Sequence, residues 1–197
     1  MIMNPDNGAQ DIRKIIGEIQ KGNTGAFAKI IEDYKKLIGY IVFRMVSNPA
    51  DREDIAQDIF IKVYQKLNQF RFEAKFSTWI SKIAYNTCIN YLNKKETLIS
   101  QNHLTIDKDW DSSLSNPNTP LLELEKIELS EKINQEILQL PENYRMAITL
   151  FHLQEFNYQE ISEIMNLPVG TVKSYLFRGR QYLKEKLQRE YHTKVLE

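Results

Sequence analysis

The feature that most constrains the fold is a run of apolar residues at helical spacing between residues 27 and 46. These residues recur every three or four positions, at Phe27, Ile30, Ile31, Tyr34, Leu37, Ile38, Ile41, Val42, Met45 and Val46. This is the period of an α-helix with one buried face. It predicts a core helix that begins at Thr24, as N-cap, and ends near Asn48 and Pro49. Such a helix must be covered by other elements with apolar faces.

The same period recurs through most of the chain, and no stretch alternates convincingly as a β-strand would. Further helices are predicted at residues 11–21, 51–67, 77–93, 121–138 and 141–153, followed by a helical pair over 158–187. From residue 96 the sequence is rich in Ser, Asn and Asp without lasting periodicity, which is typical of a linker. We therefore predict an all-α protein of two small helical domains, residues 1–95 and 119–197, joined by an acidic flexible linker at 96–118.

The formal net charge is zero, but the charges are unevenly distributed. The net charge is +4 over residues 25–96, −7 over 97–160 and +3 over 161–197. Two mildly basic regions could each approach phosphate, whereas the acidic middle should avoid duplex DNA. The lone cysteine and three widely separated histidines predict neither a disulfide nor a metal site. Since no apolar run is long enough for a membrane span or a signal peptide, we expect a cytoplasmic protein without membrane insertion.

The helical pair near the C-terminus has a hinge at residues 166–168, "NLP". Asn157 followed by Glu160 fits a capping box for the first helix. One side of the second helix is apolar: Val172, Leu176, Gly179, Leu183 and Leu187. The other side and its flanks carry Lys173, Ser174, Phe177, Arg178, Gln181 and Lys184. This face could read the major groove of DNA, as in a helix-turn-helix. The alternative is the solvated face of an ordinary surface helix, because helix pairs are common in helical proteins.

Two long stretches resemble one protein family. Residues 140–187, "LPENYRMAITLFHLQEFNYQEISEIMNLPVGTVKSYLFRGRQYLKEKL", resemble the C-terminal domain of extracytoplasmic-function sigma factors. Residues 48–95, "NPADREDIAQDIFIKVYQKLNQFRFEAKFSTWISKIAYNTCINYLNKK", resemble that family's polymerase-binding and promoter-melting region. Where the family commonly has Ala, this chain has Ser162 and Gly179, which we expect to weaken the local helices. Asp58 replaces the commoner Glu.

The resemblance implies a docking surface for the largest subunit of RNA polymerase. The family's Gln-acid-x-Phe motif corresponds to Gln57, Asp58 and Phe60. Spacing places Asp54 and Ile61 on the same outward side, opposite the apolar stripe Ile55, Ile59, Val63 and Leu67. An exposed Ile among acids suits an interface anchor. The alternative is an ordinary solvated face.

The resemblance also implies capture of a flipped minus-10 base. The loop "QFRFEAKFST" and the helix after it supply the candidates Arg71, Phe72, Lys75, Phe76, Lys82, Asn86 and Asn90. Asn86 is the first candidate for reading the base, because an amide can hydrogen-bond a base edge. Trp79, Ile80, Ile83, Ala84 and Thr87 are expected to face the core. For Phe76 and Trp79 a core position is favoured over a DNA contact.

The implied function is transcription initiation. The chain would bind core RNA polymerase, recognise the minus-35 and minus-10 promoter elements and promote melting, without a catalytic site or cofactor of its own. An anti-sigma factor is the usual further partner in the family, and Asp107, Asp109 and Asp111 would place the linker in a basic channel of the polymerase. Two alternatives belong to other classes. An operator-binding regulator normally dimerises and needs no acidic docking face, and an enzyme needs a nucleophile, base or metal cluster that is not visible here.

Overall fold

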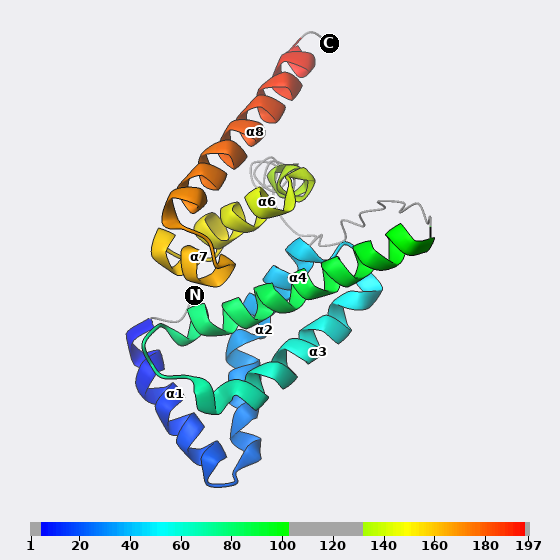
Figure 1. The fold of residues 1–197 in the computed structure, drawn as a ribbon. Helices are drawn as coiled ribbons and strands as arrows, with labels where there is room; N and C mark the ends of the chain where they lie inside the picture. Colours follow the sequence, from blue (N-terminus) through cyan, green and yellow to red (C-terminus); the bar gives the residue numbers. More distant parts are fainter. Residues whose placement is uncertain (1–4, 103–131, 196–197) are drawn as a thin grey trace, which may run out of the picture.

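The N-terminal part of the chain folds into four helices around one apolar core. The structure, a computed structural model, describes residues 5–102 and 132–195, and none of these lies in a β-strand. The four helices are α1 (Pro5–Gln20), α2 (Phe27–Met45), α3 (Pro49–Lys66) and α4 (Phe76–Asn102). Helix α2 packs against both α3 and α4, and α1 packs against the start of α2 (Figure 1).

Helix α2 confirms the predicted apolar stripe but not its predicted start. Ile30, Ile38 and Ile41 are fully buried, whereas Ile31 is partly exposed. Thr24 instead opens a 3-10 turn, η1 (Thr24–Ala26), which runs directly into α2. The N-cap of α2 is therefore Ala26, which already has helical dihedrals and makes no side-chain cap hydrogen bond. The prediction that Thr24 caps this helix was wrong for that reason.

Helix α3 begins two residues before its predicted start, because Asn48 caps it. The Asn48 side chain accepts a hydrogen bond from the Ala50 N–H at 3.2 Å and donates one to the Asp51 carboxylate at 2.7 Å. Pro49 occupies the first turn, where a missing N–H costs nothing. The Tyr91 hydroxyl of α4 also donates to Asp51, so the cap joins α3 to α4.

Helix α4 extends to Asn102, beyond its predicted end at residue 93. Residues 76–102 contain no Gly or Pro that would end the helix earlier. Residues 96–102, predicted to be linker, are therefore helical. The remaining predicted linker residues, 103–118, lie outside the described residues, as do Asp107, Asp109 and Asp111.

The C-terminal part contains the predicted helical pair. Its elements are a helical segment at 132–139, α6 (Glu142–Ile148), a π-helical segment η3 (Thr149–Leu153), α7 (Tyr158–Met165) and α8 (Val169–Val195). Helices α6 and α7 both pack against α8. The start of the helix predicted at 121–138 lies outside the described residues. No helix in the described ranges is long and apolar enough to cross a membrane.

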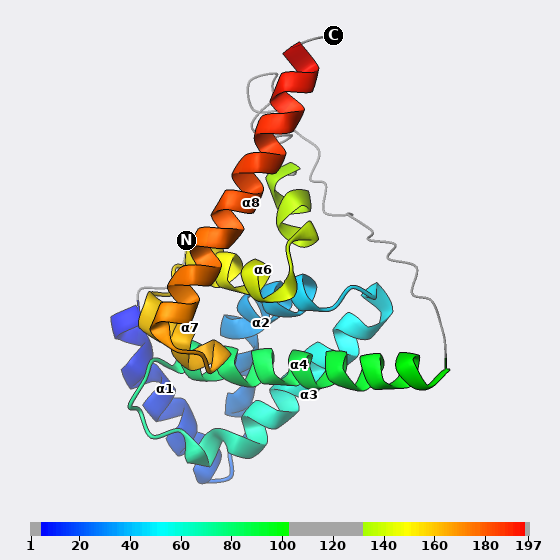
Figure 2. The ribbon, with the colours of Figure 1, turned by 45° about the horizontal axis from the view of Figure 1, so that its top comes forward.

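The two parts are in contact. Helix α7 packs against α4, and α6 packs against α2. Figures 1 and 2 both show α7 beside the first half of α4. Helix α4 is thus covered by α2 and α3 on one side and by α7 on another.

Candidate nucleic-acid and polymerase interfaces

Local hydrogen bonds define both ends of α7, the first helix of the C-terminal pair. The Asn157 side chain accepts from the Glu160 N–H at 2.9 Å, and the Glu160 carboxylate accepts from the Asn157 N–H at 2.8 Å. This is the predicted capping box. Asn166 ends the helix in the left-handed conformation at φ 53°. The Ser162 hydroxyl donates to the Leu167 carbonyl, so this serine stabilises the turn as well as weakening the helix.

The inward face of α8 is the predicted one. Val172 and Leu176 are buried, at 0% and 1% exposed. Gly179 is also buried, and a Cβ placed there would lie 2.9 Å from Cγ1 of Ile148 in α6. The glycine therefore allows α8 to approach α6 more closely than the alanine common in the family would allow. This close packing explains why a glycine stands at position 179, although glycine has a lower helix propensity than alanine.

The opposite face of α8 is open to solvent. All six residues predicted to contact DNA on α8 are exposed: Lys173, Ser174, Phe177, Arg178, Gln181 and Lys184. Phe177 is 70% exposed, although it directly follows the buried Leu176. Arg178 lies at the edge nearest α6, where its Nη1 is 3.4 Å from the Tyr144 hydroxyl. A wide face that combines cations, amides and one projecting aromatic ring can contact both phosphates and base edges in a major groove.

Helix α3 presents the predicted outward surface. Its inward stripe is buried at Ile55, Ile59, Val63 and Leu67. Asp54, Gln57 and Asp58 are exposed on the other side, and Phe60 is half-buried. Ile61 is 54% exposed and Tyr64 41% exposed, so this acidic surface also offers apolar contact area. Tyr64 packs edge-on against Phe27 of α2 and was not among the residues predicted for this surface.

The loop between η2 (Leu67–Gln69) and α4 is built on a cluster of aromatic rings. Phe70, Phe76 and Trp79 are in mutual contact at centroid distances of 5.1–5.3 Å. Phe76 also meets Tyr34 of α2 at 5.2 Å and is only 6% exposed. Its assignment as a base contact is therefore corrected: Phe76 belongs to the core, the alternative that the sequence favoured. Trp79 is half-buried.

Phe72 occupies the outer edge of this aromatic cluster in a constrained conformation. Its φ is 60°, which is uncommon for a bulky residue. Its ring contacts Phe70 at 4.6 Å, and the Arg13 guanidinium of α1 lies 4.4 Å from its centre. Arg13 was missed by sequence reasoning, because nothing in the sequence connects it with a loop about sixty residues away. Arg71, which precedes Phe72 in the sequence, and Lys75, three residues after it, are both exposed.

The minus-10 candidates on α4 belong to an exposed polar stripe of this helix. Lys82, Asn86, Asn90 and Asn93 are exposed, whereas Ile80, Ile83 and Ala84 are buried. The stripe is narrow because helices cover α4 on two sides. Its amide groups can donate to and accept from the edges of unpaired bases.

Arg180 is another residue that sequence reasoning left out, although it lies two positions after the predicted Arg178. The residue is exposed on α8, its Nε donates to His152 Nε2 at 3.1 Å, and its guanidinium lies 5.1 Å from the Phe151 ring centre. Burial and the nearby positive charge of Arg180 lower the pKa of His152. The imidazole is therefore favoured in its neutral form, in which Nε2 can accept the hydrogen bond from Arg180. Among the residues that the structure describes, no group of His, Cys, Asp and Glu could hold a metal ion.

Comparison with known proteins places both halves of the chain in one class. The family described as Sigma-70 region 2 matches residues 30–97, and that described as Sigma-70, region 4 matches residues 130–183. The chain is 37% identical to the ECF RNA polymerase sigma factor SigW of Bacillus subtilis, over 90% of this chain and 97% of that protein. It is 35% identical to the ECF RNA polymerase sigma-E factor of Escherichia coli K12, over 88% and 93%.

Solved structures agree on the fold. The sigma factor RpoE of Bartonella quintana, crystallised with the anti-sigma factor NepR, matches with a TM-score of 0.68 at 20% identity over 82% of this chain and 96% of that one. CnrH, solved with the cytosolic domain of CnrY, matches with a TM-score of 0.63 at 17% identity over 91% and 98%.

The two regions define a sigma factor of the sigma-70 class. With its relatives, the chain belongs to the extracytoplasmic-function (ECF) family of RNA polymerase sigma factors. It initiates transcription together with core RNA polymerase by recognising promoter DNA.

Proposed function

We propose that promoter recognition is divided between two surfaces of this chain and that a third surface docks on the polymerase. The C-terminal domain, residues 119–197, reads the minus-35 element through the exposed face of α8. The N-terminal domain, residues 1–95, captures and melts the minus-10 element. The observation that carries this proposal is the α8 face, where Phe177 projects into solvent at 70% exposure among polar and basic side chains. A large aromatic side chain on such a face suits a base contact.

The minus-10 surface consists of the exposed loop residues Arg71 and Lys75, the ring of Phe72, and the α4 residues Lys82, Asn86 and Asn90. Asn86 lies mid-stripe, where its amide can hydrogen-bond an exposed base edge, while the lysines hold phosphate. Melting is driven by binding energy, because captured unpaired bases offset the stacking that is lost. The chain needs no catalytic group or cofactor for this step, and the polymerase performs the phosphoryl transfer.

The docking surface is the outward side of α3, with Asp54, Gln57, Asp58, Phe60 and Ile61. Its carboxylates suit a basic partner surface, and Ile61 supplies an apolar anchor that is 54% exposed. Because sigma factors act with cytoplasmic polymerase, we place the protein in the cytoplasm. The structural relative RpoE, solved in complex with the anti-sigma factor NepR, supports an anti-sigma factor as a further partner of this chain.

Docking is tested by replacing Gln57 and Asp58 together with Ala. Both side chains are exposed, so the double variant should keep its helical content and melting temperature but bind core polymerase more weakly. The control is the double replacement of Glu32 and Lys36, two exposed residues of α2, by Ala. Affinity is measured by titrating labelled protein with core polymerase. Equal affinity of the docking variant and the wild-type chain would remove this assignment.

A further inference from the structure

A side chain of α1 reaches the loop that the proposed function assigns to the minus-10 base. This loop, residues 70–75 between η2 and α4, is here called the minus-10 loop. We propose that Arg13 of α1 is a positioning residue for promoter opening, because it lies over the ring of Phe72 and holds the minus-10 loop in the shape that captures an unpaired base. This role rests on the proposed function of the loop. It adds a residue from outside the stretch that matches Sigma-70 region 2, residues 30–97.

Backbone hydrogen bonds hold the two ends of the minus-10 loop but not its middle. At the start, the Phe70 N–H donates to the Leu67 carbonyl, and at the end the Lys75 carbonyl accepts from the Trp79 N–H. In the part of the chain that the structure describes, residues 71–74 form no backbone hydrogen bond. Side-chain contacts must therefore set the conformation of this middle stretch.

Phe72, within this stretch, has a conformation that its neighbours must stabilise. Its φ of 60° lies in the left-handed region, which bulky side chains rarely occupy and which persists only where surrounding groups hold it. The Phe70 ring centre is 4.6 Å from that of Phe72, and the guanidinium carbon of Arg13 is 4.4 Å from it. Groups of this size at such distances cannot share one face of a ring. Phe72 is therefore held between Phe70 and Arg13.

Arg13 can act as a fixed support because α1 is anchored on the core. Ile12 and Ile16 are buried, at 3% and 5% exposed, whereas Arg13 itself is exposed. Gln20, two helical turns after Arg13 and so on the same face, donates to Asn68 of η2 at 3.3 Å. This contact is long and exposed, so it shows which face of α1 meets this segment without holding the loop. Figures 1 and 2 both show α1 beside the minus-10 loop.

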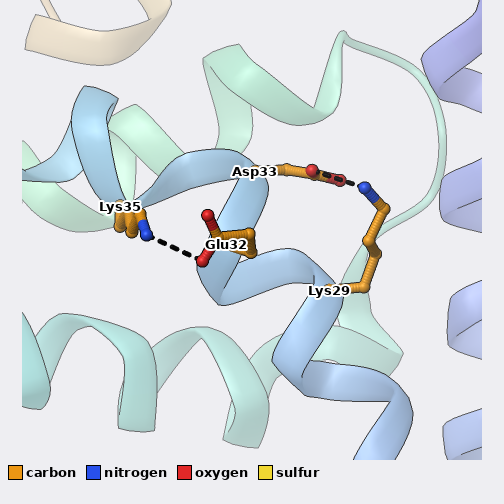
Figure 3. Close-up of polar contacts among 4 residues, drawn as sticks. All are labelled: Lys29, Glu32, Asp33 and Lys35. Atoms are coloured by element: carbon orange, nitrogen blue, oxygen red, sulfur yellow. Dashed lines mark hydrogen bonds and ion pairs between the residues drawn. The ribbon is translucent and has the colours of Figure 1, made fainter.

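The charge of Arg13 is not used in an ion pair. Among the side chains that the structure describes, no carboxylate lies within ion-pair distance of its guanidinium. Lys29 of the neighbouring α2 is different, because its Nζ lies 2.7 Å from the Asp33 carboxylate (Figure 3). Arg13 instead meets the face of the Phe72 ring, where the ring quadrupole attracts a cation. The partner of this cation is therefore the minus-10 loop itself.

Fixing Phe72 also fixes a neighbour that is assigned to DNA. Lys75, at the end of the loop, has a support of its own, since its Nζ lies 2.9 Å from the Glu160 carboxylate of α7. Arg71 has the backbone of Phe72 as its next residue, so it moves if Phe72 leaves the left-handed region. A site that is already ordered loses less binding free energy to ordering, which leaves more to offset the stacking lost when a base is unpaired. Arg13 should therefore favour opening without contacting DNA.

Promoter opening by the full chain with core polymerase tests this role, on a promoter found by mapping transcription start sites. Permanganate reactivity of unpaired thymines measures the open complex. We expect Arg13→Ala to lower the opening equilibrium roughly two- to fivefold, as for the loss of an exposed cation–π contact. The matched control is Lys14→Ala, which removes one exposed positive charge from the next position of α1 and should open the promoter as the wild type does. Equal opening by Arg13→Ala and Lys14→Ala contradicts the proposal.

Salt dependence separates positioning from a direct phosphate contact. Removing an arginine that holds a phosphate reduces the slope of log binding constant against log salt by about one unit. If Arg13 acts through Phe72, its replacement by Ala should leave this slope at the wild-type value. A slope reduced by about one unit would overturn the proposal, because Arg13 would then be a phosphate contact itself.

A double-mutant cycle tests whether Arg13 acts through the Phe72 ring. Phe72→Ala should reduce opening by itself, and adding Arg13→Ala should reduce it no further, since the arginine has already lost its partner. In a Phe72→Tyr background, which keeps the ring, Arg13→Ala should have its full effect. Effects that multiply in the Ala–Ala double variant would show that the two residues act independently, against the proposal.

Folding is checked on each variant by circular dichroism and thermal unfolding. Because Arg13 is exposed, Arg13→Ala should keep the helical content and melting temperature of the wild type. If it fails to fold, Arg13→Gln takes its place, since glutamine keeps a long polar side chain without the charge, and the same loss of opening is expected. A folded Arg13→Gln protein that opens the promoter normally contradicts the proposal.

Failure of this role differs from failure of the proposed function. If Phe72→Ala and Arg13→Ala both open the promoter as the wild type does, the assignment of the minus-10 loop fails, and the role of Arg13 fails with it. If Phe72→Ala lowers opening and Arg13→Ala does not, the positioning role fails alone.

Discussion

Helices α4 and α8 are equally long, 27 residues each, and both are assigned to DNA, but their surroundings differ. Helix α4 is covered by α2 and α3 on one side and by α7 on another, which leaves a narrow exposed stripe. Helix α8 packs through one face only, and its other face is open from Lys173 to Lys184. The exposed stripe of α4 is mostly asparagine, whereas the open face of α8 combines charges with the ring of Phe177.

This difference matches two ways of contacting nucleic acid. A projecting helix with one free face can enter a major groove about 12 Å wide. A helix enclosed on two sides cannot enter the groove, so its amides can only meet bases that leave the duplex.

The largest effect should come from breaking the inward face of α8. Leu176→Ala removes a side chain that is 1% exposed and should lower the free energy of unfolding by about 2–5 kcal/mol. Its neighbour provides the control: Phe177→Ala should change stability by no more than about 0.5 kcal/mol yet weaken binding to minus-35 DNA. Thermal unfolding and duplex titration separate the two. A Phe177→Ala variant with unchanged DNA affinity would show that the ring makes no base contact.

Sequence reading by α8 should be sensitive to Arg178. Arg178→Ala should weaken binding to a matched minus-35 duplex by roughly 5- to 150-fold and relax preference at one or two base pairs. Lys184→Ala should weaken matched and scrambled duplexes alike and reduce the salt slope by about one unit. Both variants are titrated on both duplexes at several salt concentrations, with core polymerase present. If Arg178→Ala lost affinity equally on both duplexes, Arg178 would hold phosphate without reading sequence, and shape readout would have to supply specificity.

A smaller effect on promoter opening is expected from a substitution in the polar stripe of α4. Asn86→Ala should reduce open-complex formation by about 0.5–1.5 kcal/mol, or roughly two- to tenfold, because it removes one hydrogen-bonding amide. Permanganate reactivity of unpaired thymines measures opening, and polymerase binding should be unchanged. Asn68→Ala, at an exposed asparagine outside the stripe, is the control. A normal bubble in the Asn86→Ala complex would leave Asn86 as a surface residue only.

The smallest expected effect is a dependence of stability on pH, which arises from His152 in the C-terminal part. The pKa of His152 lies below its ordinary value in the folded state, so the unfolded state binds more protons below about pH 6.5. Stability should therefore fall as the pH drops through 6.5 toward the folded pKa, and it should be fully present above 6.5. His152→Gln should reduce the slope of a plot of melting temperature against pH. The variant contradicts the expectation if it melts with the wild-type slope between about pH 7.5 and 5.5.

The sequence by itself determined the helices, because apolar spacing depends only on which residues follow one another. It was enough to predict the inward stripes of α2, α3 and α8, the capping box at Asn157 and the turn at Asn166. Boundaries were less certain, as the start of α2 and the end of α4 show. The ends of a helix depend on local capping hydrogen bonds and on where helix-breaking residues occur, rather than on apolar periodicity.

Only the tertiary structure decided which side chains meet across long sequence distances. Arg13 lies over Phe72, Phe76 sits in an aromatic core, and Gly179 allows α8 to approach α6. The second covered side of α4, with the Lys75–Glu160 pair, was likewise invisible in the sequence. A periodic pattern shows that a face is buried but not what buries it, because that choice is made by packing between elements that local sequence does not connect.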